Sequence, residues 1–115
     1  MLPTELSRQV DAGRAELLLQ VDAALPWFTG HFPGQPLLPG VAQLDWALHY
    51  GIALLAPGKA FAAVESIKFQ QPVLPDARLS LRLSWNPTKN QLSFSYAIQR
   101  IQAEKIASSG KISLC

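Results

Sequence analysis

A histidine and an aspartate fourteen residues apart, joined by a stiff loop, are the residues of this chain best suited to acid–base chemistry. They are His31 and Asp45. Prolines fix φ in the loop between them, and glycines permit close backbone approach. The loop residues with these properties are Pro33, Gly34, Pro36, Pro39 and Gly40. The segment therefore predicts a shaped loop that could hold a histidine near a helix.

Gly40 stands where a helix is predicted to begin. The free N–H groups at such an end can bind a developing negative charge. Asp45 lies four residues after Val41 and three before Leu48, so the spacing predicts that it faces inward. A buried carboxylate is costly unless it is paired or protonated. Two interpretations stay open from the residues alone. The pair could do chemistry, or Asp45 could tie the loop to the helix while His31 is purely structural.

The surrounding elements are predicted from the hydrophobic period. Apolar residues recur at steps of three and four over 41–55, at Val41, Leu44, Leu48, Ile52 and Leu55, which predicts one amphipathic helix. Period-two alternation predicts strands over 14–21, 61–71, 78–85, 91–101 and 105–114. Short turns between strands favour an antiparallel meander. The chain is therefore predicted to be one α+β domain over residues 1–115, with about five strands against one helix.

The composition is apolar for so short a chain. Of 115 residues, 49% are hydrophobic and 16% charged, against a usual charged share of about 25%. This excludes a disordered chain. The predicted sheet face is also broader than one helix can cover. We therefore expect a second subunit to cover the remaining apolar surface.

Several classes of function are disfavoured by what the sequence lacks. Cys115 is the single cysteine, so no internal disulfide and no zinc-binding cysteine pair are expected. The ten Lys and Arg are dispersed, and against eight Asp and Glu they give a net charge of +2, which does not indicate nucleic-acid binding. No signal peptide or bilayer-spanning segment is recognised. We expect a cytoplasmic protein without membrane association, cofactor or metal.

The loop resembles the active-site signature of the 3-hydroxyacyl-acyl-carrier-protein dehydratases of type II fatty-acid synthesis. The pattern His-Phe-Pro-Gly-x-Pro-x-x-Pro-Gly is intact over residues 31–40, and residues 69–75 resemble the family's strand after the helix. The similarity covers residues 14–114. The resemblance implies the hot-dog fold, in which an antiparallel sheet wraps around one central helix.

The resemblance also implies site residues. His31 would remove the proton at C2, Asp45 would protonate the departing hydroxyl, and the Gly40 N–H would polarise the thioester carbonyl. The residues implied to contact substrate are Gly40, Val41, Phe32 and Pro33. The expected product is a trans-2-enoyl thioester.

The chain departs from the family pattern around the acid. The larger branch of the family has Glu in place of Asp45, and the branch that also isomerises the double bond has Asp there. Both branches commonly have Ala and Gln where this chain has Trp46 and His49. His49 could orient Asp45 or make an ordinary polar contact. Trp46 and Tyr50 lie off the predicted stripe and are expected at a dimer contact. The short chain is most similar to a dehydratase-like subfamily of aryl-polyene pathways.

The resemblance implies partners as well. These are an acyl carrier protein that carries the substrate, and a second subunit that makes a homodimer or a heterodimer with a related chain. In this family the histidine and the acid of one site come from different subunits. Two other functions remain open, a hot-dog thioesterase and a non-catalytic acyl-binding or pairing subunit. The intact histidine loop argues against the thioesterase.

Overall fold

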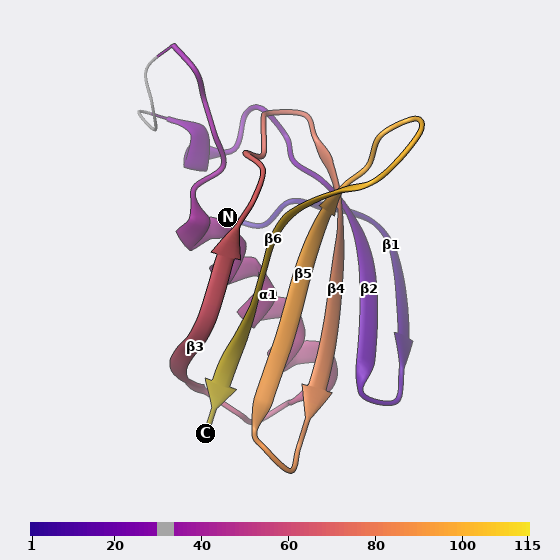
Figure 1. Ribbon diagram of the computed structural model, residues 1–115, viewed down its shortest axis with the longest axis vertical. Helices are drawn as coiled ribbons and strands as arrows, with labels where there is room; N and C mark the ends of the chain where they lie inside the picture. The colour runs from indigo at the N-terminus through magenta and orange to yellow at the C-terminus, as the bar shows by residue number, and fades with distance from the viewer. Residues whose placement is uncertain (30–33) are drawn as a thin grey trace.

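A computed structural model of the chain describes residues 1–29 and 34–115. In this part of the chain, one α-helix crosses one face of a six-stranded sheet (Figure 1). The elements in chain order are β1 (Thr4–Asp11), β2 (Arg14–Gln20), the 3-10 turn η1 (Pro26–Phe28), α1 (Gly40–Leu55), β3 (Phe61–Phe69), β4 (Arg78–Asn86), β5 (Gln91–Ile98) and β6 (Lys105–Leu114). The α+β class and the single helix against an antiparallel sheet are as predicted.

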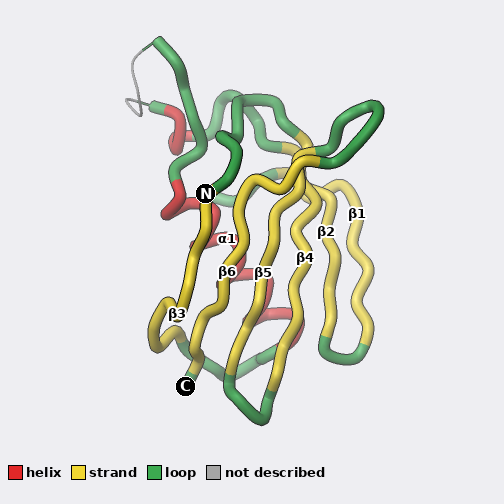
Figure 2. The backbone as a smooth tube through the Cα atoms, in the orientation of Figure 1, coloured by secondary structure: helices red, strands yellow, loops and turns green. Residues whose placement is uncertain are grey.

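The strand order is β1-β2-β4-β5-β6-β3, and every neighbouring pair is antiparallel (Figure 2). The strand β1 is absent from the prediction of about five strands, which is one too few. Every residue of β1 is exposed, so its sequence carries no alternation that would reveal it. Its hairpin with β2 turns at Gly13, whose φ of 75° suits glycine.

The face of the sheet toward α1 is the core, and the alternation predicts most of it correctly. Its fully buried strand residues include Leu17, Leu19, Leu79, Leu81, Leu92, Tyr96 and Ile112. Ile106 is predicted to lie in phase with Ile112, but it is 36% exposed. The reason is a register shift where β6 passes Tyr96 and Ala97 of β5, which ends the simple alternation.

The helix buries a different face from the one predicted. The predicted stripe is partly or largely exposed, with Val41 at 62%. The buried residues of α1 are Ala42, Gln43, Trp46, Ala47, Tyr50 and Gly51. The helix is apolar on two sides, so period alone does not select one. The small Gly51 selects the buried side, because it lets α1 approach Leu92 of β5 more closely than a side chain would permit.

One side of this core is uncovered. α1 packs against β2, β4 and β5, whereas all nine residues of the edge strand β3 are exposed. The large apolar residues among them are Phe61, Val64, Ile67 and Phe69. Register with Ile112 and Gly110 of β6 places Val64 and Ile67 on the α1 side of the sheet. No helix in the described residues is long and apolar enough to cross a membrane.

Candidate active site

A pocket of about 350 Å³ lies at the N-terminal end of α1. It is formed where the loop that enters the helix meets the end of β3 and the segment after it. Its lining residues are Leu37, Leu38, Pro39, Gly40, Gln43, Phe69, Gln70, Gln71 and Pro72. The walls are mainly apolar. A polar ligand group in this pocket would therefore depend on a few donors for its hydrogen bonds.

Gly40 is the first residue of α1 and faces this pocket. No described residue accepts a hydrogen bond from its N–H, whereas the N–H groups of Ala42 and Gln43 both donate to the carbonyl of Pro39. The ring of Phe69 lies against Gly40, because a Cβ built there would be 2.5 Å from Phe69 Cζ. A free N–H at a helix N-terminus attracts a partial negative charge. The thioester-polarising role implied for Gly40 stays a prediction.

A buried polar network supports the same end of the helix. Gln43 is 3% exposed, and its Oε1 accepts a hydrogen bond of 2.6 Å from the Ser108 hydroxyl. Its Nε2 donates to the carbonyl of Leu38 at 3.4 Å, and its main-chain carbonyl accepts from the Tyr96 hydroxyl at 2.6 Å. Burial raises the pKa of Tyr96 well above its ordinary value, so this hydroxyl stays a neutral donor.

Gln43 and Ser108 are functional candidates that the sequence did not reveal. The one available signal was a polar residue between Ala42 and Leu44 in a mainly apolar helix. That signal is weak, because the predicted stripe placed this side of α1 outward. Ser108 lies in β6, 65 residues away, and its contact with Gln43 arises only when the sheet is assembled.

Asp45 is exposed, so the prediction that it faces inward is wrong for the single chain. It lines a separate open hollow of about 460 Å³ with Leu48, His49, Ile52 and Ala53. Five helical residues correspond to about 140° around the axis, which separates Asp45 from the side of α1 that carries Gly40. The two candidates therefore do not share a hollow within the described part of one chain.

The remaining predicted site residues give a mixed result. Val41 is exposed at the first turn of α1. His31, Phe32 and Pro33 lie outside the described residues. His49 is exposed beside Asp45, and its ring makes an edge contact with Tyr50, at 5.1 Å between centroids. The catalytic and substrate-contacting roles of these residues remain predictions.

Two tryptophans anchor the segments on either side of the motif. The indole N–H of Trp27, before the loop, and that of Trp46, after Asp45, each donate to the carbonyl of Met1 at 2.9 Å. Trp46 is fully buried and Tyr50 is 5% exposed. The expectation that both lie at a dimer contact is therefore wrong. They instead fill the space between α1 and the rest of the same chain.

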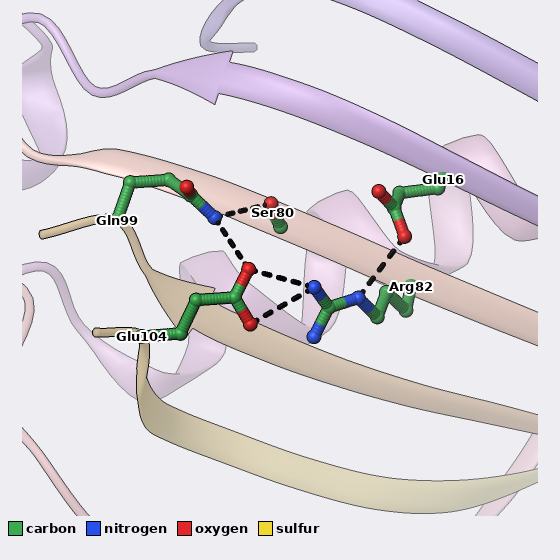
Figure 3. Close-up of polar contacts among 5 residues, drawn as sticks. All are labelled: Glu16, Ser80, Arg82, Gln99 and Glu104. Atoms are coloured by element: carbon green, nitrogen blue, oxygen red, sulfur yellow. Dashed lines mark hydrogen bonds and ion pairs between the residues drawn. The ribbon is translucent and has the colours of Figure 1, made fainter. Parts of the chain in front are cut away.

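A polar cluster on the opposite face of the sheet is not part of the pocket (Figure 3). Arg82 of β4 donates to Glu16 at 3.0 Å and to both oxygens of Glu104 at 2.8 and 2.9 Å, while Gln99 joins Glu104 to Ser80. The amide of Gln99 and the guanidinium of Arg82 lower the pKa of Glu104. The cluster fastens the loop between β5 and β6 to the sheet. The described residues contain no group of three side chains suited to hold a metal.

Two solved structures match the whole chain. One is a protein from Erwinia carotovora subsp. atroseptica, which is 53% identical, has a TM-score of 0.93, and is matched over 100% of this chain and 97% of its own. The other is a chain of the dehydratase heterocomplex ApeI:P from Xenorhabdus doucetiae. It is 46% identical, has a TM-score of 0.93, and is matched over 100% of this chain and 99% of its own. These matches confirm the predicted hot-dog dehydratase fold.

Sequence relatives are consistent with this fold. The 3-hydroxyacyl-acyl-carrier-protein dehydratase FabZ of Herpetosiphon aurantiacus is 32% identical over 107 residues, which are 87% of this chain and 76% of that enzyme. The match to an enzyme of the same name from Mannheimia succiniciproducens spans 43% of that enzyme's length. The family model described as ApeI-like, ApeI dehydratase, matches residues 7–111. The chain therefore belongs to the ApeI-like dehydratase family, a branch of the hot-dog dehydratases that its motif resembled.

Proposed function

We propose that this protein removes water from a 3-hydroxyacyl thioester carried on acyl carrier protein and releases the trans-2-enoyl thioester. The pathway is fatty-acid or aryl-polyene biosynthesis. The observation that carries the proposal is the mainly apolar pocket of about 350 Å³ at the start of α1, whose wall includes Gly40, a residue with no hydrogen-bond acceptor for its N–H among the described residues. Similarity to FabZ and ApeI dehydratases supports the same reaction.

The reaction divides into three tasks. The neutral imidazole of His31 takes the proton from C2, and the electron pair forms the C2=C3 double bond. The C3–O bond breaks, and Asp45 gives its proton to the departing hydroxyl, which leaves as water. Charge that develops on the thioester oxygen is stabilised by the Gly40 N–H and the positive end of the helix dipole.

Asp45 would act as a proton donor best in a site that excludes water. Within one chain it is open to solvent. The apolar residues beside it on α1, Leu44, Leu48 and Ile52, are only partly covered. A second subunit over this face would exclude water and bring its own histidine loop to Asp45. Two sites shared between subunits follow from this arrangement.

The edge strand β3 is the second part of the proposed interface. Its α1-side face carries four exposed apolar residues, Phe61, Val64, Ile67 and Phe69, and its outer backbone edge has no neighbouring strand among the described residues. Such an edge is a ready template for strand pairing. The partner is a second copy or a related hot-dog chain. The heterocomplex formed by the Xenorhabdus doucetiae dehydratase supports the latter.

An assay with a 3-hydroxyacyl-carrier-protein substrate tests the proposed reaction. Asp45→Asn and His31→Ala should each lower the dehydration rate about 100-fold or more, because each removes a proton-transfer group. Asp11→Asn, an exposed change in β1, serves as the control. Mixing the two inactive variants should restore part of the activity if sites are shared. Near-normal turnover by either variant would overturn the assignment. Cleavage of the thioester or binding alone would instead indicate a thioesterase or a pairing subunit.

The interface is tested by placing a charge on each face of β3. Val64→Lys, on the α1 side, should yield monomers on size-exclusion chromatography and abolish turnover. Ser66→Lys, on the opposite face, should leave both assembly and turnover unchanged. Register places Val64 opposite Ile112 and Ser66 opposite Lys111 of β6, so the two positions differ mainly in face. A monomeric wild-type protein with full activity would contradict the shared site.

A further inference from the structure

Gln43 is the one buried amide on the wall of the pocket, among the described residues, and the mechanism above does not use it. It is 3% exposed, and it lines the pocket together with Gly40. An amide buried in an apolar wall costs folding free energy unless its polar atoms are bonded. The bonds of Gln43 therefore indicate which of its atoms have a structural task and which are spare.

The network orients the carboxamide. Oε1 accepts from the Ser108 hydroxyl at 2.6 Å, a short and strong contact, and Ser108 is itself fully buried. Nε2 lies next to the carbonyl of Leu38, which can only accept. Leu38 is held in turn, because its N–H donates to the carbonyl of Val73 at 2.9 Å. The amide oxygen is thus directed toward β6 and the amide nitrogen toward the loop that enters α1.

The amide nitrogen has more donor capacity than this arrangement uses. An NH₂ group carries two hydrogens, and the single acceptor found for Nε2 in the described residues is Leu38, at 3.4 Å. Ordinary N–H···O hydrogen bonds are about 2.9–3.0 Å long, so this one is weak. A side chain that only joined α1 to β6 would need the bond to Ser108 alone. The spare N–H is therefore a candidate for ligand contact.

Gln43 and Gly40 lie on the same side of α1. Three helical residues correspond to about 300°, which leaves about 60° between the two positions around the axis. Both residues line the one pocket, whose other walls include Leu38, Phe69 and Pro72. A carbonyl group that enters this pocket would lose its hydrogen bonds to water and could accept two others, from Gly40 and Gln43.

We propose that the Gln43 carboxamide, oriented by Ser108, is a second hydrogen-bond donor to the carbonyl oxygen of the bound acyl thioester, beside the Gly40 N–H. This inference rests on the proposed function and adds a substrate-contacting residue to it. Two preorganised donors stabilise a developing oxyanion better than one, and their effect grows as charge builds on the oxygen. Gln43 should therefore act on turnover more than on substrate affinity.

Two stable mimics of the substrate test the contact directly. In one, an amide replaces the thioester of a 3-hydroxyacyl pantetheine, so the carbonyl remains; in the other, a methylene replaces that carbonyl. Dissociation constants are measured by titration of the assembly that the protein forms. Gln43→Leu should raise the dissociation constant of the carbonyl mimic about 3- to 10-fold and that of the methylene mimic less than about 2-fold. Gln102→Leu, in the exposed loop after β5, is the matched control and should change neither.

Turnover supplies a second readout. Gln43→Leu should lower kcat about 10- to 100-fold, a larger change than its effect on KM, as expected for a donor whose hydrogen bond strengthens in the transition state. Ser108→Ala keeps the amide but releases its orientation. Ser108→Ala should therefore raise the dissociation constant of the carbonyl mimic alone, by about 2- to 5-fold. If Gln43→Leu does not fold, as shown by the loss of a cooperative thermal transition, the binding of the two mimics to Ser108→Ala tests the donor role of Gln43 instead.

The outcomes separate the two levels of the proposal. If the variants weaken the binding of both mimics equally, or leave the binding of the carbonyl mimic unchanged, the donor role of Gln43 is overturned. A wild-type protein that releases no water from the thioester would refute the proposed function itself. In a protein that does release water, an equal response of the two mimics refutes only the inference about Gln43.

Discussion

Replacing Gly40 by alanine would crowd the pocket while leaving the chemistry of its N–H intact. A Cβ at this position would lie 2.5 Å from Cζ of Phe69 and 3.0 Å from a second atom of the ring. Carbon atoms in good contact are about 3.5–4.0 Å apart, so the ring must retreat by about 1 Å. Gly40 has no positive φ, so the backbone itself accepts alanine.

The cost of that retreat should appear in activity rather than in stability. Phe69 is 52% exposed within one chain, at the end of β3, so its ring can turn outward without opening the core of that chain. The free energy of unfolding should therefore change by less than about 1 kcal/mol. A displacement of about 1 Å beside a reacting group can cost about 100-fold in rate. We expect kcat/KM for dehydration to fall about 10- to 100-fold.

Gly51→Ala is the matched control, because it adds the same methyl group to the same helix away from the pocket. There the new Cβ would collide with Leu92, which is fully buried. Overpacking costs about 1–3 kcal/mol, against about 1 kcal/mol gained from helix propensity. Gly51→Ala should therefore lose up to about 2 kcal/mol of stability but keep its activity per folded molecule.

Urea unfolding and initial rates of water loss, measured on both variants, distinguish the two effects. Gly40→Ala should lose rate with an unchanged unfolding midpoint, and Gly51→Ala should show the reverse. A Gly40→Ala protein with wild-type kcat/KM would refute the expectation that crowding beside Gly40 lowers the rate, because the pocket at the start of α1 would then tolerate a displaced Phe69. Such a result would also count against this pocket as the place where the thioester binds.

Three further changes test the surrounding structure. Gly110→Ala should lower the free energy of unfolding by about 2–3 kcal/mol and speed amide hydrogen exchange in β3. The reason is that its Cβ would lie 2.6 Å from a backbone carbonyl oxygen of that strand. Unchanged exchange in β3 would contradict this expectation. Trp46→Phe should lose about 1–3 kcal/mol in urea unfolding, since it opens space in the core and removes an indole hydrogen bond; an unchanged midpoint would show that neither matters. Gln99 and Arg82 lower the pKa of Glu104 from its ordinary 4.5, so the stabilisation from this cluster is complete above pH 4.5 and is lost as pH falls through the lowered value. The NMR shift of the Gln99 side-chain amide should therefore move only below about pH 4.5, and Glu104→Gln should abolish that movement.

The alternation of β2, β4 and β5 made most of the sheet predictable, because a strand with one buried face needs apolar residues at every second position. Leu79 and Leu81 are both fully buried, as their period indicates. The same rule did not predict β1, because its eight residues are all exposed and need no alternation. It also misplaced Ile106, because a register shift changes which residues face the core.

The helix shows where period stops being informative. Its pattern correctly predicted an element over 41–55, but the buried side carries Trp46, Tyr50 and Gly51 instead of the predicted leucines and isoleucine. Both sides are apolar, and the one that fits the sheet closely is buried. The exposed position of Asp45 follows from this choice.

The family could be recognised from the chain alone, because the order and spacing of the prolines, the glycines, His31 and Asp45 are local properties of the sequence. The contact of Gln43 with Ser108, and the opening of Asp45 to solvent beside partly covered apolar residues, arise only when the chain folds. Burial depends on how closely two surfaces fit. That fit involves residues far apart along the chain, and no local pattern records it.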